Sequence, residues 1–175
     1  MRVPRSKAKR RKKSAQAVFL VGFMGAGKSS VGRALGQRLD WTFEDLDDRI
    51  ERREKRTVAE IFRALGEPSF RKAEQAALVE VLKEVRGEAR VVALGGGAFV
   101  QKENATRLKA AGVPTVFLDA PVEELWQRCR KQAGELGAER PLLRSMEGFC
   151  ELYETRRRSY SKASPSIQQT PWGNS

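Results

Sequence analysis

The chain has 175 residues, which is enough for one domain with a full hydrophobic core. Its formal net charge is +12, and it contains two cysteines and no histidine. This composition excludes a histidine general base, and the spacing of Cys129 and Cys150 does not suit a zinc site. Both cysteines are expected to be reduced thiols, as in a cytoplasmic protein. No stretch is long and apolar enough to span a bilayer, so no membrane partner is expected.

Much of the positive charge lies at the N-terminus. Eight Lys and Arg residues precede residue 14, whereas the first acidic residue is Asp40. Residues 1–14 are therefore predicted to form a basic disordered tail, followed by a single domain over residues 15–172. Such a tail is usually solvated, although contact of the tail with nucleic acid, a membrane surface or another partner stays open. Nucleic-acid binding is not expected of the rest of the chain.

A glycine-rich turn follows the first predicted strand, residues 17–21, and precedes a predicted helix at residues 28–39. The sequence there is Gly22-Phe23-Met24-Gly25-Ala26-Gly27-Lys28-Ser29. An apolar strand, a glycine-rich turn and Lys-Ser at a helix start are typical of a phosphate-binding loop. Its backbone N–H groups and helix dipole would face the phosphates of ATP, Lys28 would reach the β- and γ-phosphates, and Ser29 would bind Mg²⁺. The predicted ATP contacts are Gly25, Ala26, Gly27, Lys28, Ser29 and Ser30.

The remaining elements alternate along the chain. Strands are predicted at residues 41–43, 90–94, 115–118 and 166–170, and a mobile loop at residues 133–143. Helices are predicted at residues 48–53, 58–65, 70–85, 103–111, 122–132 and 148–159, with Gly66 ending the second of these. This alternation predicts an α/β fold of three layers, in which helices cover both faces of a parallel sheet. Because such sheets bind ligands at the carboxyl ends of their strands, the residues after the first three strands should open onto one crevice.

Two polar features follow the second and third strands. Asp45 and Asp47 are two residues apart, so extended backbone would direct both carboxylates into the crevice. The alternative is an acidic helix N-terminus without chemistry. Gly95-Gly96-Gly97 offers bare backbone N–H groups to a carboxylate or hydroxyl of a substrate, and here the alternative is a simple flexible turn.

Three arginines are further candidates. Arg140 lies in the predicted mobile loop, from which it could close over the phosphates and neutralise transition-state charge. Arg71 begins a long helix, and Arg156 is the first of three consecutive arginines on the last helix. For both of them a solvated helix face is the alternative.

Taken together, these residues resemble the shikimate kinase family from about Val18 to Tyr160. The resemblance rests on the order and spacing of the phosphate-binding loop, Asp45-Leu46-Asp47, Phe70-Arg71-Lys72-Ala73-Glu74, Gly95-Gly96-Gly97, Arg140-Pro141-Leu142-Leu143, and Arg156 four residues before Tyr160. It implies a P-loop fold like that of nucleoside-monophosphate kinases, with a substrate-binding helical insert at about 47–72 and a lid at about 131–144. It also implies transfer of the γ-phosphate of ATP to the 3-hydroxyl of shikimate, on the pathway to chorismate and the aromatic amino acids.

The resemblance also assigns roles. Ser29 and Asp45 would hold Mg²⁺, while Asp47 would bind the shikimate hydroxyls and serve as the candidate base. Arg71, Arg156 and the run Gly95, Gly96 and Gly97 would bind shikimate, with the two arginines on its carboxylate. Arg140 would be the lid arginine, Arg130 would lie against adenine, and the catalytic set would be Lys28, Asp47 and Arg140. A monomer is expected.

Two alternatives stay open. One is another small-metabolite kinase of the same architecture. The other is a catalytically weak binding module, because the family normally continues past the last strand into a further helix that the residues up to Ser175 do not supply. The lid is also somewhat long before Arg140.

Overall fold

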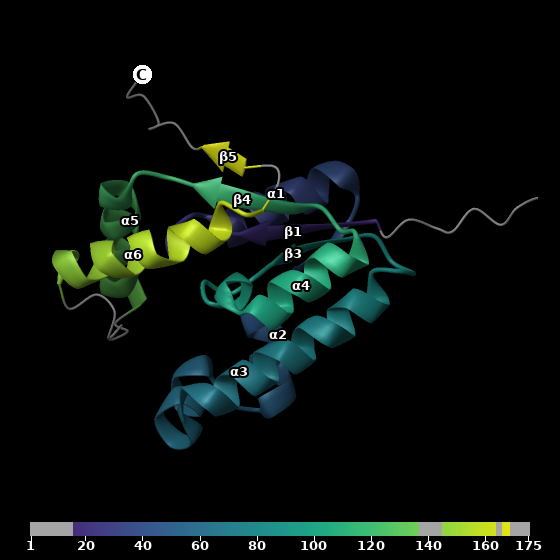
Figure 1. Ribbon diagram of the computed structural model, residues 1–175, viewed down its shortest axis with the longest axis horizontal. Coiled ribbons are helices and arrows are strands. Elements are labelled where there is room, and N and C mark those ends of the chain that lie inside the picture. The colour runs from purple at the N-terminus through teal and green to yellow at the C-terminus, as the bar shows by residue number, and fades with distance from the viewer. Residues whose placement is uncertain (1–15, 137–144, 164–165, 169–175) are drawn as a thin grey trace, which may run out of the picture.

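The computed structural model describes residues 16–136, 145–163 and 166–168. Within them, all strands join one parallel sheet in the order β2-β3-β1-β4-β5 (Figure 1). The strands are β1 (Ala17–Val21), β2 (Thr42–Asp45), β3 (Arg90–Ala93), β4 (Thr115–Asp119) and β5 (Ser166–Gln168). The predicted parallel α/β sheet is thus confirmed. The predicted tail at residues 1–14 and the lid arginine Arg140 lie outside the described residues.

Helices cover both faces of this sheet, as predicted. The helices are α1 (Lys28–Leu39), α2 (Leu46–Glu54), α3 (Val58–Glu84), α4 (Lys102–Ala111), α5 (Val122–Leu136) and α6 (Met146–Tyr160), with a 3₁₀ turn η1 at Ala98–Val100. The connection from β1 to β2 runs toward the β2 edge of the sheet, and a right-handed crossover in that direction places α1 on one face. The later connections run the other way and put α3, α4 and α6 on the opposite face, where α3 and α4 lie side by side (Figure 1). No helix in the described part of the chain has the length and apolar composition needed to cross a bilayer.

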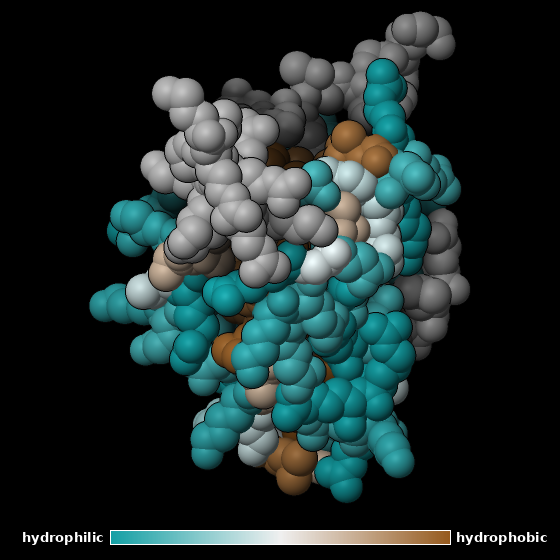
Figure 2. Space-filling view, turned by 90° about the vertical axis from the view of Figure 1, so that its right-hand side faces the viewer, coloured by the Kyte–Doolittle hydropathy of each residue, from teal (hydrophilic) through white to brown (hydrophobic). Residues whose placement is uncertain are grey.

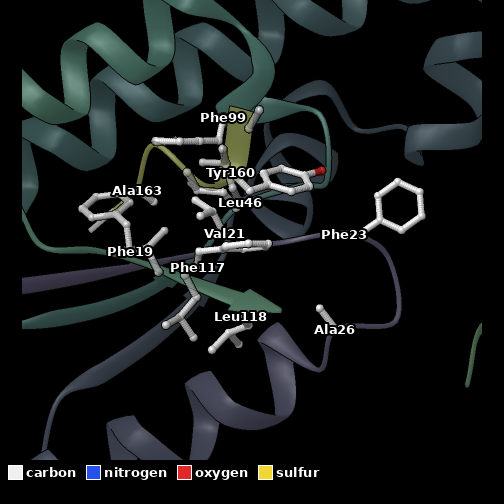
Figure 3. Packing of buried hydrophobic residues seen from close by; sticks show 14 of the residues in the cluster. Phe19, Val21, Phe23, Ala26, Leu46, Phe99, Phe117, Leu118, Tyr160 and Ala163 are labelled. Carbon is white, nitrogen blue, oxygen red and sulfur yellow. The ribbon is translucent and has the colours of Figure 1, made fainter. Parts of the chain in front are cut away.

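The core lies on both sides of β1. Tyr160 and Phe99 lie on one side of the strand, and Leu118 and Ala26 lie on the other, near the start of α1 (Figure 3). This follows from the alternation of side chains along parallel strands that are buried on both faces. The molecular face in Figure 2 is mostly hydrophilic, and its hydrophobic areas are small and separate.

Several element boundaries differ from those predicted. The two predicted helices around Gly66 form one element, α3, but Gly66 has φ 76° and ψ 171°, so the helical backbone is interrupted where the glycine predicted an end. β2 extends to Asp45, and α2 begins at Leu46, earlier than predicted. α5 continues to Leu136, so residues 133–136 are helical rather than part of a mobile loop.

An ion-pair network covers the edge strand β2. Glu44 is 9% exposed, and its carboxylate accepts hydrogen bonds from Arg49 at 2.7 Å and from Arg90 at 2.7 Å. Arg90 is also buried, and it pairs with Glu84 at 2.7 Å. The network therefore ties β2 to β3 and to the ends of α2 and α3. Charged side chains of this kind also discourage pairing of the edge strand with another chain.

Removing one partner from this network should destabilise the fold. Glu44→Gln leaves Arg90 buried with less charge compensation, and we expect a loss of about 3 kcal/mol in the free energy of unfolding. Glu80→Gln is the matched control, because that side chain is 46% exposed and lies 3.6 Å from Arg49. The control should lose less than about 1 kcal/mol. Urea denaturation measures both, and equal losses would contradict this account.

Candidate active site

The phosphate-binding loop has the backbone that its glycines predict. Gly25 and Gly27 have φ of 78° and 76°, values that glycine adopts without strain. Gly27 caps α1, so the N–H groups of the first helical turn lack helical partners and face the loop. A Cβ on Gly25 would lie 2.8 Å from the Cys129 sulfur, which shows how closely α5 packs on the loop. Together these features form a nest for anions.

Lys28 lies beneath the loop it belongs to. Its Nζ donates hydrogen bonds to the carbonyl oxygens of Gly22 and Phe23, at 3.0 and 2.9 Å. Burial lowers the pKa of Lys28, while the nearby carboxylates of Asp47 and Asp45 oppose that shift. The ammonium group is therefore placed between the loop and the two aspartates at the end of β2 and the start of α2.

The two aspartates are both in the site, but they are not two residues of one extended strand. Asp45 is extended and caps α2, accepting a hydrogen bond from the Asp47 N–H at 3.1 Å. Asp47 is in the first turn of α2, so the predicted extended pair was wrong, and the acidic helix start considered as the alternative is present. The reason is that a side-chain cap at Asp45 starts the helix at once. Asp47 nevertheless points back to the glycine run.

Ser29 and Asp45 bring two oxygen ligands together. The Ser29 hydroxyl donates to Asp45 Oδ2 at 2.8 Å, which joins the start of α1 to the end of β2. A hydroxyl and a carboxylate beside a phosphate-binding loop fit Mg²⁺, which prefers oxygen ligands and retains several waters. In the described residues no cluster of three or more acidic, cysteine or histidine side chains forms a metal site made by protein alone.

Asp47 has an environment suited to proton transfer. Its Oδ1 is buried and has no hydrogen-bond partner, and it would lie 2.6 Å from a Cβ on Gly95. Burial raises the pKa of Asp47 to about 6; Asp45 adds to this rise, and Lys28 opposes it. A carboxylate of this kind is ionised at neutral pH and has an unused acceptor atom.

The glycine run makes room for side chains rather than for unusual backbone. A Cβ on Gly97 would lie 2.5 Å from Arg71 Nη1, and a Cβ on Gly95 would lie 2.6 Å from Asp47 Oδ1. None of the three glycines has a positive φ, so the close approach of other side chains, rather than the backbone conformation, is what requires glycine here. Only glycine allows Asp47 and Arg71 to approach this backbone so closely.

Arg71 is held in place by acidic neighbours. Its guanidinium pairs with Glu74 at 3.0 Å and with Glu67 at 2.8 Å. Glu74 is fully buried, and burial raises its pKa to about 7 while Arg71 opposes the rise. Sequence reasoning gave Glu74 no role of its own; the signal for that role was its spacing of three residues from Arg71 on a helix.

Arg156 reaches the same point from α6. Its guanidinium lies 5.9 Å from the ring centre of Phe23 in the phosphate-binding loop, and its Nη1 would lie 3.6 Å from a Cβ on Gly96. The next two arginines in the sequence do not reach this point: Arg157 pairs with Asp119 at 2.8 Å, and Arg158 is exposed. Arg71, Arg156, Asp47 and Lys28 are therefore gathered around one glycine run.

The helix before the lid presents a different arginine to the loop from the one expected. Arg130 is exposed, and its guanidinium lies over the Trp126 ring at 5.9 Å. Arg128 instead donates to the Gly25 carbonyl at 3.4 Å and pairs with Glu124 at 2.9 Å. Sequence reasoning missed Arg128, although the buried positions Leu125 and Cys129 mark the face of α5 on which it lies.

Comparisons with known proteins agree on one family. The model of the shikimate kinase family matches residues 24–172. The chain is 42% identical to a shikimate kinase of Geobacter metallireducens over 90% of this chain and 84% of that protein. It is 40% identical to one of Cereibacter sphaeroides over 87% of this chain and 74% of that protein. The solved shikimate kinase from Acinetobacter baumannii in complex with shikimate has a TM-score of 0.79 and 34% identity, over 92% of this chain and 87% of that one.

The raised pKa of Asp47 predicts a cost to stability in the free protein. Because the folded pKa of about 6 exceeds its ordinary value of 3.8, ionisation of Asp47 opposes folding, and this cost grows as pH rises between those values. Asp47→Asn should therefore raise the melting temperature at pH 7.5. The free energy of unfolding should increase by up to about 3 kcal/mol. The gain should fade as pH drops from 6 to 4.

The matched control for this stability effect is Asp40→Asn at the exposed end of α1. Asp40 has φ 55°, a conformation that Asn also tolerates, so its melting temperature should equal that of the wild type across this pH range. Thermal unfolding followed by circular dichroism measures all three proteins. A loss of stability in Asp47→Asn at every pH would show that the buried carboxylate is not a cost.

Proposed function

The chain belongs to the shikimate kinase family, and on that premise we propose how its residues perform the reaction. The protein is an ATP-dependent phosphotransferase that phosphorylates shikimate, a step in aromatic amino acid biosynthesis. The phosphate goes to the 3-hydroxyl, giving shikimate 3-phosphate. The observation that carries the proposal is the gathering of Asp47, Arg71 and Arg156 with Lys28 at one glycine run.

ATP binds at the loop after β1. The N–H groups of Gly25, Ala26, Gly27 and the first turn of α1, including Ser29 and Ser30, surround its phosphates. Lys28 gives up a carbonyl partner and donates to the β- and γ-phosphates. Because Lys28 is already part of the loop, this exchange requires only a change of its side-chain partners.

Ser29 and Asp45 would hold Mg²⁺ beside those phosphates. The Ser29 hydroxyl would bind the ion and Asp45 would assist through water, which suits an ion that retains part of its hydration shell. When bound, Mg²⁺ supplies charge neutralisation for the transferred phosphoryl group.

Shikimate binds between α3, α6 and the glycine run. Arg71 and Arg156 clamp its carboxylate, because a planar guanidinium matches a carboxylate with two parallel hydrogen bonds. Gly95, Gly96 and Gly97 add backbone contacts at the same end. Glu74 does not compete for the substrate, since its carboxylate is buried against Arg71 and fixes that side chain.

Asp47 is the base. Its unpartnered Oδ1 faces the glycine run, and with a pKa of about 6 it can accept the proton of the attacking hydroxyl at neutral pH. Lys28 lies close to Asp47 and favours its ionised form. The hydroxyl oxygen then attacks the γ-phosphorus, and ADP leaves.

The lid completes the site over the nucleotide. Arg140 neutralises charge on the transferred phosphoryl group, and closure of the lid segment that follows α5 excludes water as a competing acceptor. The family resemblance assigns Arg130 to adenine; the contact of Arg128 with the Gly25 carbonyl supports Arg128 as the nearer candidate.

Several broader features complete the proposal. A single kinase domain at residues 15–172, with a substrate-binding insert at about 47–72, works as a monomer in the cytoplasm. The basic tail at residues 1–14 is not needed for the reaction, and the rest of the chain does not bind nucleic acid. The two alternatives, a kinase for another small metabolite and a binding module, are not favoured by the family membership.

A conservative change at Arg156 tests this assignment. Arg156→Lys keeps the charge but loses the paired hydrogen bonds, so the KM for shikimate should rise about tenfold or more while the KM for ATP stays within about twofold. Arg158→Lys, on the exposed face of the same helix, is the control and should match the wild type. A coupled assay for ADP measures all three proteins.

The same assay separates the alternatives. ADP release should depend on shikimate and Mg²⁺. Turnover with gluconate or a nucleoside monophosphate but not with shikimate would identify a different kinase, and ATP binding without turnover on any acceptor would identify a binding module.

A further inference from the structure

The hydroxyl of Tyr160 lies beneath the glycine run, at the end of α6. The side chain is 0% exposed, and its O–H donates a hydrogen bond to the Gly96 carbonyl oxygen. Its ring packs on Phe117 of β4, with 5.4 Å between the ring centres, and it lies on the same side of β1 as Phe99 (Figure 3). The aromatic ring therefore anchors the residue in the core, while its polar end reaches the backbone of the site.

The chemistry of this hydroxyl suits a permanent donor. Burial raises the pKa of Tyr160 to about 12, and the positive charge of Arg156 partly opposes that rise. The hydroxyl thus stays protonated at any working pH and always has a proton for the Gly96 carbonyl. Residues four apart on a helix lie on one face, so Tyr160 and Arg156 approach the glycine run from the same side.

A fixed carbonyl at Gly96 has a consequence for the next residue. The peptide group is planar and trans, so the Gly97 N–H points opposite to the Gly96 carbonyl. The Gly96 carbonyl is directed at Tyr160 in the core, so the Gly97 N–H is directed away from the core. Gly97 is also the residue against which Arg71 packs. Glycine at both positions leaves this peptide free to rotate unless something holds it.

We propose that Tyr160 is a positioning residue for shikimate, which holds the Gly96–Gly97 peptide so that the Gly97 N–H faces the substrate carboxylate. This inference rests on the proposed carboxylate site at Arg71 and Arg156. Tyr160 itself does not touch the substrate; it acts through the peptide it holds. Packing against Phe117 requires only the ring, which Phe would also supply, so the hydroxyl is the part that acts on the site.

Tyr160→Phe tests the proposal, because it removes the hydroxyl and keeps the ring against Phe117. The KM for shikimate should rise about fivefold, the size expected for one hydrogen bond, while the KM for ATP and kcat stay within about twofold. The matched control is Tyr153→Phe, which removes another buried hydroxyl from α6, one that donates to Asp119 at 2.8 Å at the end of β4. This control should lose a similar amount of thermal stability, yet keep the wild-type KM for shikimate.

The outcomes are distinguishable. An unchanged KM for shikimate in Tyr160→Phe, or an equal rise in both variants, would overturn the role of Tyr160. If Arg156→Lys raises the KM in the same assay while Tyr160→Phe does not, this inference fails and the carboxylate site stands. If neither Arg156→Lys nor Tyr160→Phe changes the KM for shikimate, the carboxylate site itself is wrong. Isothermal titration of shikimate into each folded variant checks that the change lies in binding.

Discussion

The structure depends on the meeting of three strand ends at one edge of the sheet. β2, β3 and β1 are neighbours in that order and are all parallel, so the residues that follow them are neighbours as well. The phosphate-binding loop follows β1, Asp45 ends β2 with Asp47 just beyond it, and the glycine run follows β3. Glycine at 95 and 97 then lets Asp47 and Arg71 approach the backbone within a distance that any side chain would block. The site is therefore a product of topology and of missing side chains.

Charge in this site is arranged at a cost to the free protein. Burial raises the pKa values of Asp47 and Glu74 and lowers that of Lys28, so each group is held in surroundings that oppose its ionised form. Opposite charges nearby limit these shifts: Arg71 stabilises ionised Glu74, and Lys28 stabilises ionised Asp47. Anionic and hydroxylated substrates would provide the missing partners. Groups with shifted pKa values commonly gather at catalytic sites for this reason.

The sequence was most informative where chemistry is local. The phosphate-binding loop, the parallel sheet and the proximity of the three clusters were predictable, because glycine spacing and the strand–helix alternation are local patterns. The conformation of Asp47 was not, since one side-chain cap at Asp45 decides where the strand ends and the helix begins. The positions of Arg128 and Arg130 depend on how α5 rotates against the loop, which tertiary packing decides. The position of Tyr160 four residues after Arg156 was visible in the sequence, but its hydrogen bond to a backbone carbonyl was not, because residue patterns do not show such contacts.

The most direct test of the central claim is the structure of the protein with shikimate, Mg²⁺ and a non-hydrolysable ATP analogue. The account predicts the shikimate carboxylate between Arg71 and Arg156, and its 3-hydroxyl between Asp47 and the γ-phosphate, with the reacting atoms about 3–3.5 Å apart. Shikimate bound with its carboxylate away from both arginines, or with its 3-hydroxyl beyond reach of the phosphate, would contradict it.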